Sequence, residues 1–535
     1  MKLRHPTTGA VYGAQDDGLV KVEQDGRWGL FTPQGEWRSG ELHEADLHFL
    51  GWVGGPTLTP RAAALGAVAA APPAPGPPPD LSMRRSQGMD LALSGKKALG
   101  LSYQQLLDSD TRPVPEVLRW QSARELPEAN VPLERYTSRA FHDLEVEKVW
   151  KKVWQMACRE EEIPEVGDRT TYEIADLSVL IVRTGPAEIR AFPNACLHRG
   201  RQLCDAPGFA SQIRCPFHGW TWNLDGSLKT IPARWDFPHV EREQYRLPEL
   251  KVGSWGGFVF VTFDRAAAPL SAHLGELPKH FERWPLEKRY KEAHVAKILR
   301  CNWKVAQEAF MEAYHVIATH PQLLPGIGDA NSQYDAWDTF SRAITPNMTP
   351  SPHLEWQPSE QDMLDSMFSR SLDAEPMLRV PEGMTARQLL AQVTRMQLQA
   401  SVPSVQDLTD AELADSFYYT LFPNFHPWGA YNRIVYRFRP LGNDPDRCTM
   451  EVIYLSPFRG RRPPPAPVHR LAEDEDWTNA PELGFLARVF NQDTTNLPKV
   501  QLGLHSAQHT HTTFGQYQET KIRHFHALLD GYVSA

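Results

Sequence analysis

Two mixed pairs of cysteine and histidine are the residues of this chain best suited to bind metal. Cys196 and His198 form the first pair, and Cys215 and His218 form the second. A cysteine and a histidine two residues apart on an extended segment point to the same side, so a tight loop can present both donors to one centre. Structural zinc sites more often combine a Cys-x-x-Cys with a His-x-x-x-His pair. The mixed pairs therefore favour an iron-sulfur cluster over zinc, which is the alternative.

The two pairs resemble the ligand set of a Rieske [2Fe-2S] cluster, in which two cysteines hold one iron and two histidines hold the other. Gly200, Pro216, Gly219 and Trp220 surround the pairs. Glycines let backbone amides turn toward sulfide, and aromatic rings exclude water. Because neutral imidazoles replace two thiolates, the reduction potential should exceed that of an all-cysteine cluster. We expect the cluster to act as a one-electron relay.

A second pair of histidines, His315 and His320, follows the segment 302–312. Together with the cluster pairs, this stretch is similar to the Rieske non-haem iron oxygenases, specifically to the catalytic alpha subunit of ring-hydroxylating oxygenases. The resemblance runs from about Leu101 to the C-terminus. In that family a histidine, four intervening residues and a second histidine bind mononuclear Fe(II). The resemblance therefore implies that His315 and His320 are iron ligands.

The spacing of these two histidines makes a structural demand. A step of five residues on an ideal helix rotates about 500°, which leaves the imidazoles roughly 140° apart. Pro321 directly follows His320 and disfavours the helical conformation there. We therefore expect the helix to end at His320 or to widen into a π-type turn.

A facial iron site needs a carboxylate beside the two imidazoles. The resemblance places this third ligand on a distant helix. The matching stretch is 488–493, continued by 500–504, which makes Asp493 the candidate. The competing acids lie in a run that is typical of a solvated loop or helix start. They are Asp474, Glu475 and Glu482.

Glu312 lies three residues before His315, which on a helix would place both on nearly the same face. In the family an acidic residue here bridges the iron-ligating histidine of one subunit and a cluster-ligating histidine of its neighbour. The implied route runs from His218 through Glu312 to His315 across a subunit boundary. It requires a closed head-to-tail ring, usually a trimer. The alternative role is a buried carboxylate that only orients His315.

The resemblance implies a terminal oxygenase that uses O2 and electrons from a separate NAD(P)H-dependent reductase, directly or through a ferredoxin, to hydroxylate an aromatic or polycyclic substrate. No Gly-x-Gly-x-x-Gly follows a predicted strand, so the reductase should be another protein. Many ring-dihydroxylating members have Asn where this chain has Ala309, and Glu312 resembles members that act on quaternary ammonium compounds. A monooxygenase or demethylase acting on methyl ethers or quaternary ammonium compounds is therefore the alternative. An electron-transfer Rieske protein without catalytic iron is the rival from another class.

Composition limits the partners and the compartment. The chain has 56 basic and 65 acidic residues and a net charge of −9, which gives no reason to expect nucleic acid or membrane as a partner. Six cysteines are too few for a disulfide scaffold. The N-terminus lacks the apolar core of a signal peptide. These features predict a cytoplasmic protein; a β subunit in the trimer stays open.

The chain divides by composition, and the fold class expected is α+β. The expected regions are an accessory β-meander (1–58), an Ala/Pro-rich linker (59–95), an N-terminal segment packing on the oxygenase core (96–140), a small β Rieske [2Fe-2S] domain (141–265) and a catalytic domain (266–535) with a helix-covered, START-like antiparallel sheet. Strands are expected at 20–22, 28–31, 179–182, 258–261, 431–439 and 450–454, and helices at 143–158 and 385–399. The second helix opens with a capping box. It is expected to form part of a lid or substrate channel, and the alternative is a helix that only packs on the domain.

Overall fold

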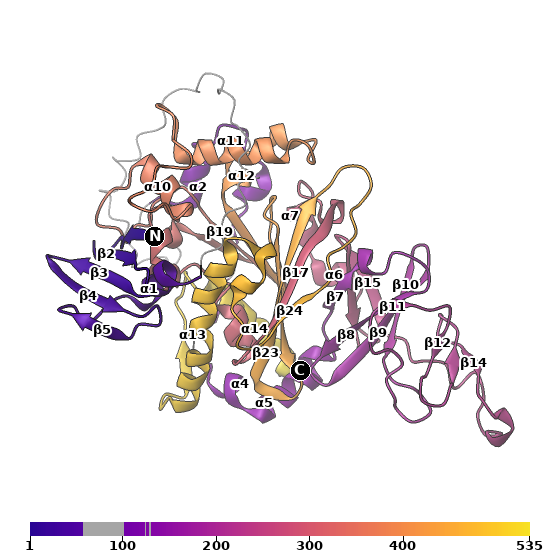
Figure 1. Cartoon of the computed structure of the whole chain (residues 1–535). Helices are drawn as coiled ribbons and strands as arrows, with labels where there is room; N and C mark the ends of the chain where they lie inside the picture. Colours follow the sequence, from indigo (N-terminus) through magenta and orange to yellow (C-terminus); the bar gives the residue numbers. More distant parts are fainter. Residues whose placement is uncertain (57–100, 123–124, 128–129, 535) are drawn as a thin grey trace.

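The computed structural model describes residues 1–56, 101–122, 125–127 and 130–534. Three parts are visible along the molecule: a small N-terminal sheet, a large central sheet covered by helices, and a group of small sheets at the far end (Figure 1). The predicted α+β class is confirmed. The predicted linker 59–95 lies outside the described residues.

Residues 1–56, which we call the N-terminal module, contain the expected meander. Five antiparallel strands follow one another in sequence order. They are β1 (Lys2–Arg4), β2 (Val11–Ala14), β3 (Val20–Gln24), β4 (Arg27–Phe31) and β5 (Trp37–Gly40). Alternating buried residues such as Val20 and Val22 form one face of this sheet, which confirms the predicted strand period.

The prediction missed a helix at the end of the module, α1 (Leu47–Gly54). Asp46 caps it by accepting a hydrogen bond from the backbone N–H of Phe49 at 2.7 Å. Two glycines and a length of eight residues hide the helical period. The helix forms because its apolar side chains cover the meander and the catalytic domain. Those side chains are Phe49, Leu50, Trp52 and Val53.

The segment before the small sheets packs on the catalytic domain. Its elements are α2 (Tyr103–Leu107), α3 (Glu116–Arg119), β6 (Asn130–Pro132), α4 (Glu134–Thr137) and α5 (Arg139–Glu145). Tyr103 donates a hydrogen bond to Asp415 at 2.9 Å. The helix expected over 143–158 is wrong in extent. A π-helical turn at Val146–Trp150 ends it, and residues 155–159 pair as a strand with β16, because strand pairing overrides local helix propensity.

The region predicted to hold the cluster consists of three small antiparallel sheets. Their strands are β7 (Gln155–Arg159), β8 (Asp168–Ile174), β9 (Leu177–Gly185), β10 (Glu188–Pro193), β11 (Gly208–Phe209), β12 (Ile213–Arg214), β13 (Thr221–Trp222), β14 (Leu228–Thr230), β15 (Lys251–Trp255) and β16 (Phe258–Thr262). The orders are β10-β9-β8-β11, β12-β13-β14 and β15-β16-β7. The expected strands 179–182 and 258–261 fall within β9 and β16.

The catalytic domain is built on one eight-stranded sheet with the order β18-β19-β20-β21-β22-β23-β17-β24. The strands are β17 (Arg289–Leu299), β18 (Gln333–Ala336), β19 (Phe340–Thr345), β20 (Ser416–Leu421), β21 (Phe425–Pro427), β22 (Ile434–Leu441), β23 (Asp444–Pro457) and β24 (His469–Leu471). The predicted strands 431–439 and 450–454 correspond to β22 and β23, and β22 begins three residues later than predicted. The sheet is antiparallel except at one edge, where β24 pairs parallel to β17, a difference from the prediction.

Helices cover this sheet, and one of them, α13, carries Asp493, whereas His315 and His320 flank the short helix α9. They are α6 (Leu270–Leu274), α7 (Leu277–Phe281), α8 (Trp303–Glu308), α9 (Val316–Thr319), α10 (Glu360–Met367), α11 (Ala386–Leu398), α12 (Asp410–Ala414), α13 (Leu486–Ser506) and α14 (Thr520–Val533). The capping box predicted for α11 is present, with Thr385 and Gln388 bonded reciprocally. β25 (His511–Thr513) pairs with β6.

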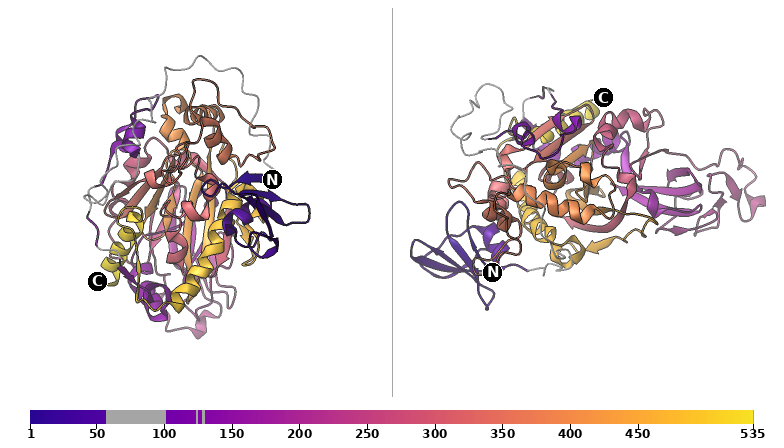
Figure 2. Two further views of the ribbon diagram at one scale, coloured as in Figure 1. Left: turned by 90° about the vertical axis from the view of Figure 1, so that its left-hand side faces the viewer. Right: turned by 90° about the horizontal axis from the view of Figure 1, so that it is seen from above.

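The N-terminal module and the small sheets lie at opposite ends of the molecule (Figures 1 and 2). The module sits against α13, whereas β12 and β14 form the far tip. Within the described parts of the chain, every helix is too short or too polar to span a bilayer.

A buried ion pair ties α8 to α5. Lys304 Nζ lies 2.8 and 2.9 Å from the two carboxylate oxygens of Glu145, and both side chains are 0% exposed. Replacing Glu145 with alanine leaves a buried ammonium without its partner, and we expect a loss of about 3 to 5 kcal/mol of stability. The thermal transition containing the catalytic domain, followed by calorimetry, measures the loss. The double variant Glu145→Ala/Lys304→Met should recover most of it, and an equally unstable double variant contradicts the explanation.

Candidate metal centres

The two predicted cluster loops have the same backbone pattern. In the loop after β10, the Cys196 N–H donates to the carbonyl of Arg201 at 2.8 Å, and the Gly200 N–H donates back to the carbonyl of Cys196 at 2.9 Å. In the loop between β12 and β13, Cys215 and Gly219 make the equivalent bonds at 2.8 and 3.1 Å. Both glycines have φ of 77°, a conformation that favours glycine. The sequence therefore builds two matching loops that face each other.

The four predicted cluster ligands meet between these loops with the sulfurs inside. Cys196 and Cys215 are 4% and 2% exposed, whereas His218 is exposed and His198 half-buried. The two imidazole rings lie 4.7 Å apart, and the ring of His198 stacks on Trp220 at 5.1 Å. Two inner thiols and two outer imidazoles suit a two-iron cluster whose histidine-bound iron faces the surface.

The protonation of these groups also suits metal binding at the outer end. Burial and the neighbouring His218 lower the pKa of His198, so its imidazole is neutral and can donate a lone pair. Cys204, which follows the first loop, donates its S–H to the carbonyl of Ala206. This hydrogen bond argues against a role of Cys204 as a cluster ligand. The structure therefore brings together the two predicted cysteines and the two predicted histidines, and Cys204 is not part of this group.

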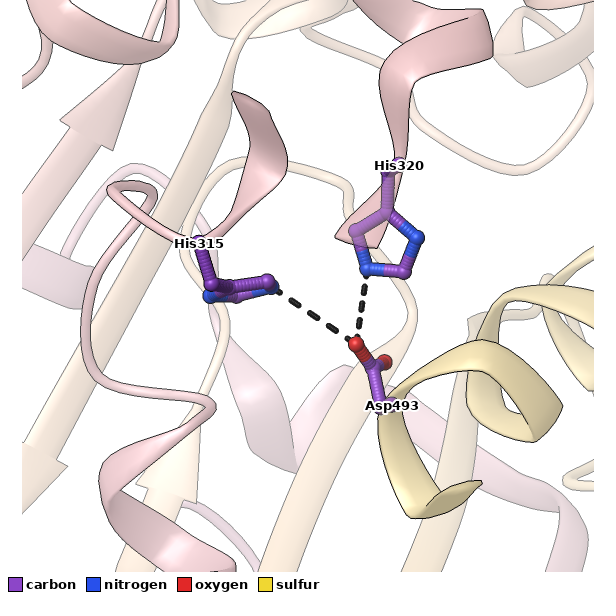
Figure 3. A group of neighbouring side chains, drawn as sticks. All are labelled: His315, His320 and Asp493. Atoms are coloured by element: carbon purple, nitrogen blue, oxygen red, sulfur yellow. Dashed lines mark hydrogen bonds and ion pairs between the residues drawn. The ribbon is translucent and has the colours of Figure 1, made fainter. Parts of the chain in front are cut away.

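His315, His320 and Asp493 come together from two separate elements (Figure 3). Asp493 Oδ1 lies 2.7 Å from His320 Nε2 and 3.6 Å from His315 Nε2. The potential ligand atoms of all three residues lie within 4.8 Å of one another, and no other set of three or more such residues does so among the residues that the structure describes. Two imidazoles and one carboxylate on one side form a facial site that leaves the opposite positions open.

The helix between the two histidines is only a single turn long, so His315 and His320 are not held on one regular helix. His315 precedes α9, and His320 follows it with φ −127° and ψ 51°, outside the helical region. Pro321 then starts a 3-10 turn, Pro321–Leu323. The predicted helix end at His320 is confirmed.

Glu312 contacts His315, although not by the helical geometry expected. The chain leaves α8 after Glu308, and Glu312 lies in an irregular turn. Its carboxylate accepts hydrogen bonds from His315 Nδ1 at 2.7 Å and from the His315 backbone N–H at 3.0 Å. Burial works against a charged imidazole, but the Glu312 charge and hydrogen bond outweigh it and raise the pKa of His315 to about 9. The contact orients His315 so that Nε2 faces the site.

His320 has a partner that the sequence reasoning did not single out. Its Nδ1 lies 2.9 Å from Oε1 of Gln492, the residue before Asp493. Gln322 bonds the same amide. An amide side chain gives no periodic or spacing signal, so only the tertiary structure identifies this contact.

The structure brings none of the three competing carboxylates to the histidines, and Glu308, the acid at the end of α8, also has other partners. Glu308 bonds Tyr136 at 3.0 Å and His526 at 2.9 Å, and burial raises its pKa to about 8. Glu475 accepts from the backbone N–H of Ala472. Asp474 and Glu482 lie in the same segment before α13. Of the predicted candidates, only Asp493 reaches the histidine pair.

Both donor sets fit the groups that the sequence predicts. The two oriented imidazoles and the single carboxylate suit a ferrous ion. The paired loops with inner sulfur and outer nitrogen suit a [2Fe-2S] cluster.

Comparison with known proteins agrees with this reading. Residues 153–241 match the family described as Rieske [2Fe-2S] domain, and residues 276–535 match the family described as ring hydroxylating alpha subunit (catalytic domain). Chloroplastic choline monooxygenase of Beta vulgaris is 31% identical over 191 residues, covering 35% of this chain and 43% of that protein. Biphenyl 2,3-dioxygenase subunit alpha of Rhodococcus jostii is 30% identical over 192 residues, covering 34% and 42%.

The matched segment thus spans less than half of these two relatives. A solved structure of a quaternary ammonium Rieske monooxygenase shares the fold with a TM-score of 0.55 and 19% identity, over 76% of this chain and 95% of that one. Two family matches, one to each metal-binding domain, cover the regions where both donor sets lie. The chain belongs to the Rieske non-haem iron oxygenases, as a catalytic alpha subunit that carries a Rieske [2Fe-2S] domain and a mononuclear iron domain.

Proposed function

We propose that this protein is the terminal component of a multicomponent oxygenase, and that Cys196, His198, Cys215 and His218 hold its cluster. His315, His320 and Asp493 would hold the mononuclear iron. The open facial arrangement of these three residues is the observation that carries the proposal. When bound, the cluster stores one electron at a time and the ferrous ion activates O2. The proposal divides the chain as predicted, with 141–265 for electron storage and 266–535 for chemistry.

The chain's own residues position the donors. Glu312 accepts the Nδ1 proton of His315, and Gln492 accepts that of His320, so both imidazoles direct Nε2 to the site. Phe490, one turn before Asp493, lies 6.0 Å from the ring of Tyr436 and 6.2 Å from that of Phe310. These rings, of which Phe490 and Tyr436 are buried and Phe310 is partly buried, keep water away from one side of the site.

Electrons would come from a separate NAD(P)H-dependent reductase, directly or through a ferredoxin. The domain with the predicted cluster ligands extends away from the central sheet of the same chain (Figure 1). This arrangement supports electron transfer between neighbouring subunits of a ring-shaped homotrimer. Glu312 would connect His218 of one subunit with His315 of the next. Tyr314, which lies between Glu312 and His315 in the sequence, is 54% exposed in the single chain. A residue that is covered by a neighbouring subunit in the assembly would be exposed in this way. The six cysteines are free in the structure, which supports a reducing, cytoplasmic location.

For the substrate we propose an aromatic or polycyclic compound. The support is the apolar ring cluster beside Asp493, which favours a flat, uncharged molecule. A methyl ether or quaternary ammonium compound is the second candidate. Ala309 and Glu312 favour it, as does the similarity to choline monooxygenase.

The test is product analysis with the iron-loaded protein and a compatible reductase. The panel contains aromatic acids, polycyclic compounds, methyl ethers and betaines, and the gas is ¹⁸O2. We expect an aromatic member to gain labelled oxygen, two atoms for dihydroxylation and one for monohydroxylation. Formaldehyde or demethylated product from an ether or betaine would select the second candidate. If the native protein and the His315→Ala variant form the same oxidised products from the panel, the proposal is wrong.

A further inference from the structure

Helix α1 of the N-terminal module lies against both elements that carry the predicted iron ligands. It packs on α13, which contains Asp493, and on the 3-10 turn that follows His320. Figure 1 shows the module beside α13, far from the cluster domain. The module is therefore placed to influence the iron site and not the cluster.

One hydrogen bond of the module reaches a side chain that contacts an iron ligand. Gln492 Nε2 donates to the backbone carbonyl of His48, in the first turn of α1, at 3.2 Å. On its other side, Gln492 Oε1 faces His320 Nδ1 at 2.9 Å. A single amide thus joins the module to a predicted iron ligand.

The orientation of that amide is not fixed by its other partner. Gln492 and Gln322 bond each other reciprocally, with Gln322 Nε2 donating at 2.8 Å and Gln492 Nε2 donating at 3.3 Å. Two paired amides can turn over together and keep both bonds, because each offers one donor and one acceptor. The His48 carbonyl removes this symmetry, since a carbonyl only accepts. It requires Gln492 Nε2 on its side and Oε1 on the side of His320.

The consequence reaches the imidazole. With Oε1 facing it, His320 Nδ1 donates its proton to the Gln492 amide. Nε2, which faces Asp493 Oδ1 at 2.7 Å, is then the nitrogen that can give up its proton and bind a metal. With the amide turned over, an N–H would face Nδ1, which could then only accept, and the single proton of the neutral ring would have to stay on Nε2, where it prevents metal binding. A backbone carbonyl of the module therefore selects between a binding and a non-binding tautomer.

We propose that the N-terminal module is a positioning element of the iron site, in which the His48 carbonyl fixes the Gln492 amide and thereby holds His320 ready to bind metal. The inference rests on the proposed function, because it takes His320 and Asp493 as iron ligands. Arg488 anchors the module one turn away on α13. Its guanidinium lies 4.0 Å from the ring of Trp52 and donates to the carbonyl of Trp52.

The first test weakens this anchor in the full chain. Trp52→Ala and Arg488→Ala touch neither His320 nor Asp493, and Arg488→Ala keeps the core of the module intact. We expect each to weaken Fe(II) affinity about 10-fold, the lower end of the effect of losing a hydrogen-bonding partner of a metal ligand. Affinity is measured anaerobically by dialysis against a chelator, counting iron above that of the cluster. The visible spectrum of the cluster should not change.

The second test asks whether the module acts through the amide. Both oxygens of a carboxylate accept, so Gln492→Glu can hold the His320 Nδ1 proton without the His48 carbonyl. In the Gln492→Glu background, adding Arg488→Ala should therefore leave Fe(II) affinity within about twofold. If Arg488→Ala weakens Fe(II) affinity as much in this background as in the native protein, the effects of the two substitutions are additive, which contradicts the proposed link.

A matched control excludes general loosening of the module. Ser371→Ala removes the contact of Ser371 Oγ with Lys2 at 2.8 Å but leaves α1 on α13. This variant should bind Fe(II) like the native protein, and a 10-fold loss in it overturns the inference. If the native chain binds no iron beyond the cluster, the proposed function fails; if all variants bind equally well, only this inference fails.

Discussion

Replacement of His315 with alanine is expected to abolish substrate oxidation while leaving the cluster intact. His315 is one of three residues of the candidate iron site, and its Nε2 faces Asp493 at 3.6 Å. Losing a hydrogen-bonding partner of a metal ligand costs about 10- to 100-fold in affinity or activity, and losing a ligand itself should cost more than about 100-fold. The iron content should fall by one ion per chain, while the visible absorption of the cluster stays unchanged.

The control for this variant lies on the helix that carries Asp493. His505, near the end of α13, bonds Asp446 at 2.8 Å and is remote from the histidine pair. His505→Ala should keep its iron and its activity. If His315→Ala loses the colour of the cluster, the two donor sets have been assigned to the wrong centres.

Glu312→Gln is expected to slow electron transfer from the cluster to the iron site by about 10- to 100-fold without loss of iron. The amide oxygen can still accept the Nδ1 proton of His315, so the imidazole stays oriented. What is lost is the carboxylate charge, which lies at the proposed boundary with the His218 of a neighbouring subunit. Stopped-flow mixing of the reduced protein with O2 and substrate measures the rate at which the cluster is reoxidised.

This variant separates the two roles that the sequence leaves open for Glu312. If the carboxylate only orients His315, the glutamine variant should reoxidise its cluster at the native rate. Glu308→Gln is the matched control, because Glu308 is a neighbouring acid that bonds Tyr136 and His526 and not the iron site. It should behave like the native protein, and slowing there would point to a general effect of replacing a buried acid near the site.

The sequence identified the ligands wherever they lie close together in the chain. Cys196 and His198, like Cys215 and His218, share one tight loop, so two or three residues of spacing determine their geometry. The break after α9 was equally predictable, because Pro321 disfavours helix at His320 through local sterics. Asp493 lies 173 residues from His320 and was found through family resemblance, not through any local rule.

Contacts between distant parts of the chain were not predictable in this way. The π-helical turn at Val146–Trp150, the parallel edge strand β24 and helix α1 follow from packing and strand pairing that no short window contains. The partner of His320 is such a case, since Gln492 is one amide among many until the fold places it between that ring and the His48 carbonyl. The sequence alone thus determined which donors exist and which local loops hold them. The tertiary structure decided how the second histidine is oriented, because hydrogen bonds across a domain boundary depend on positions that only packing sets.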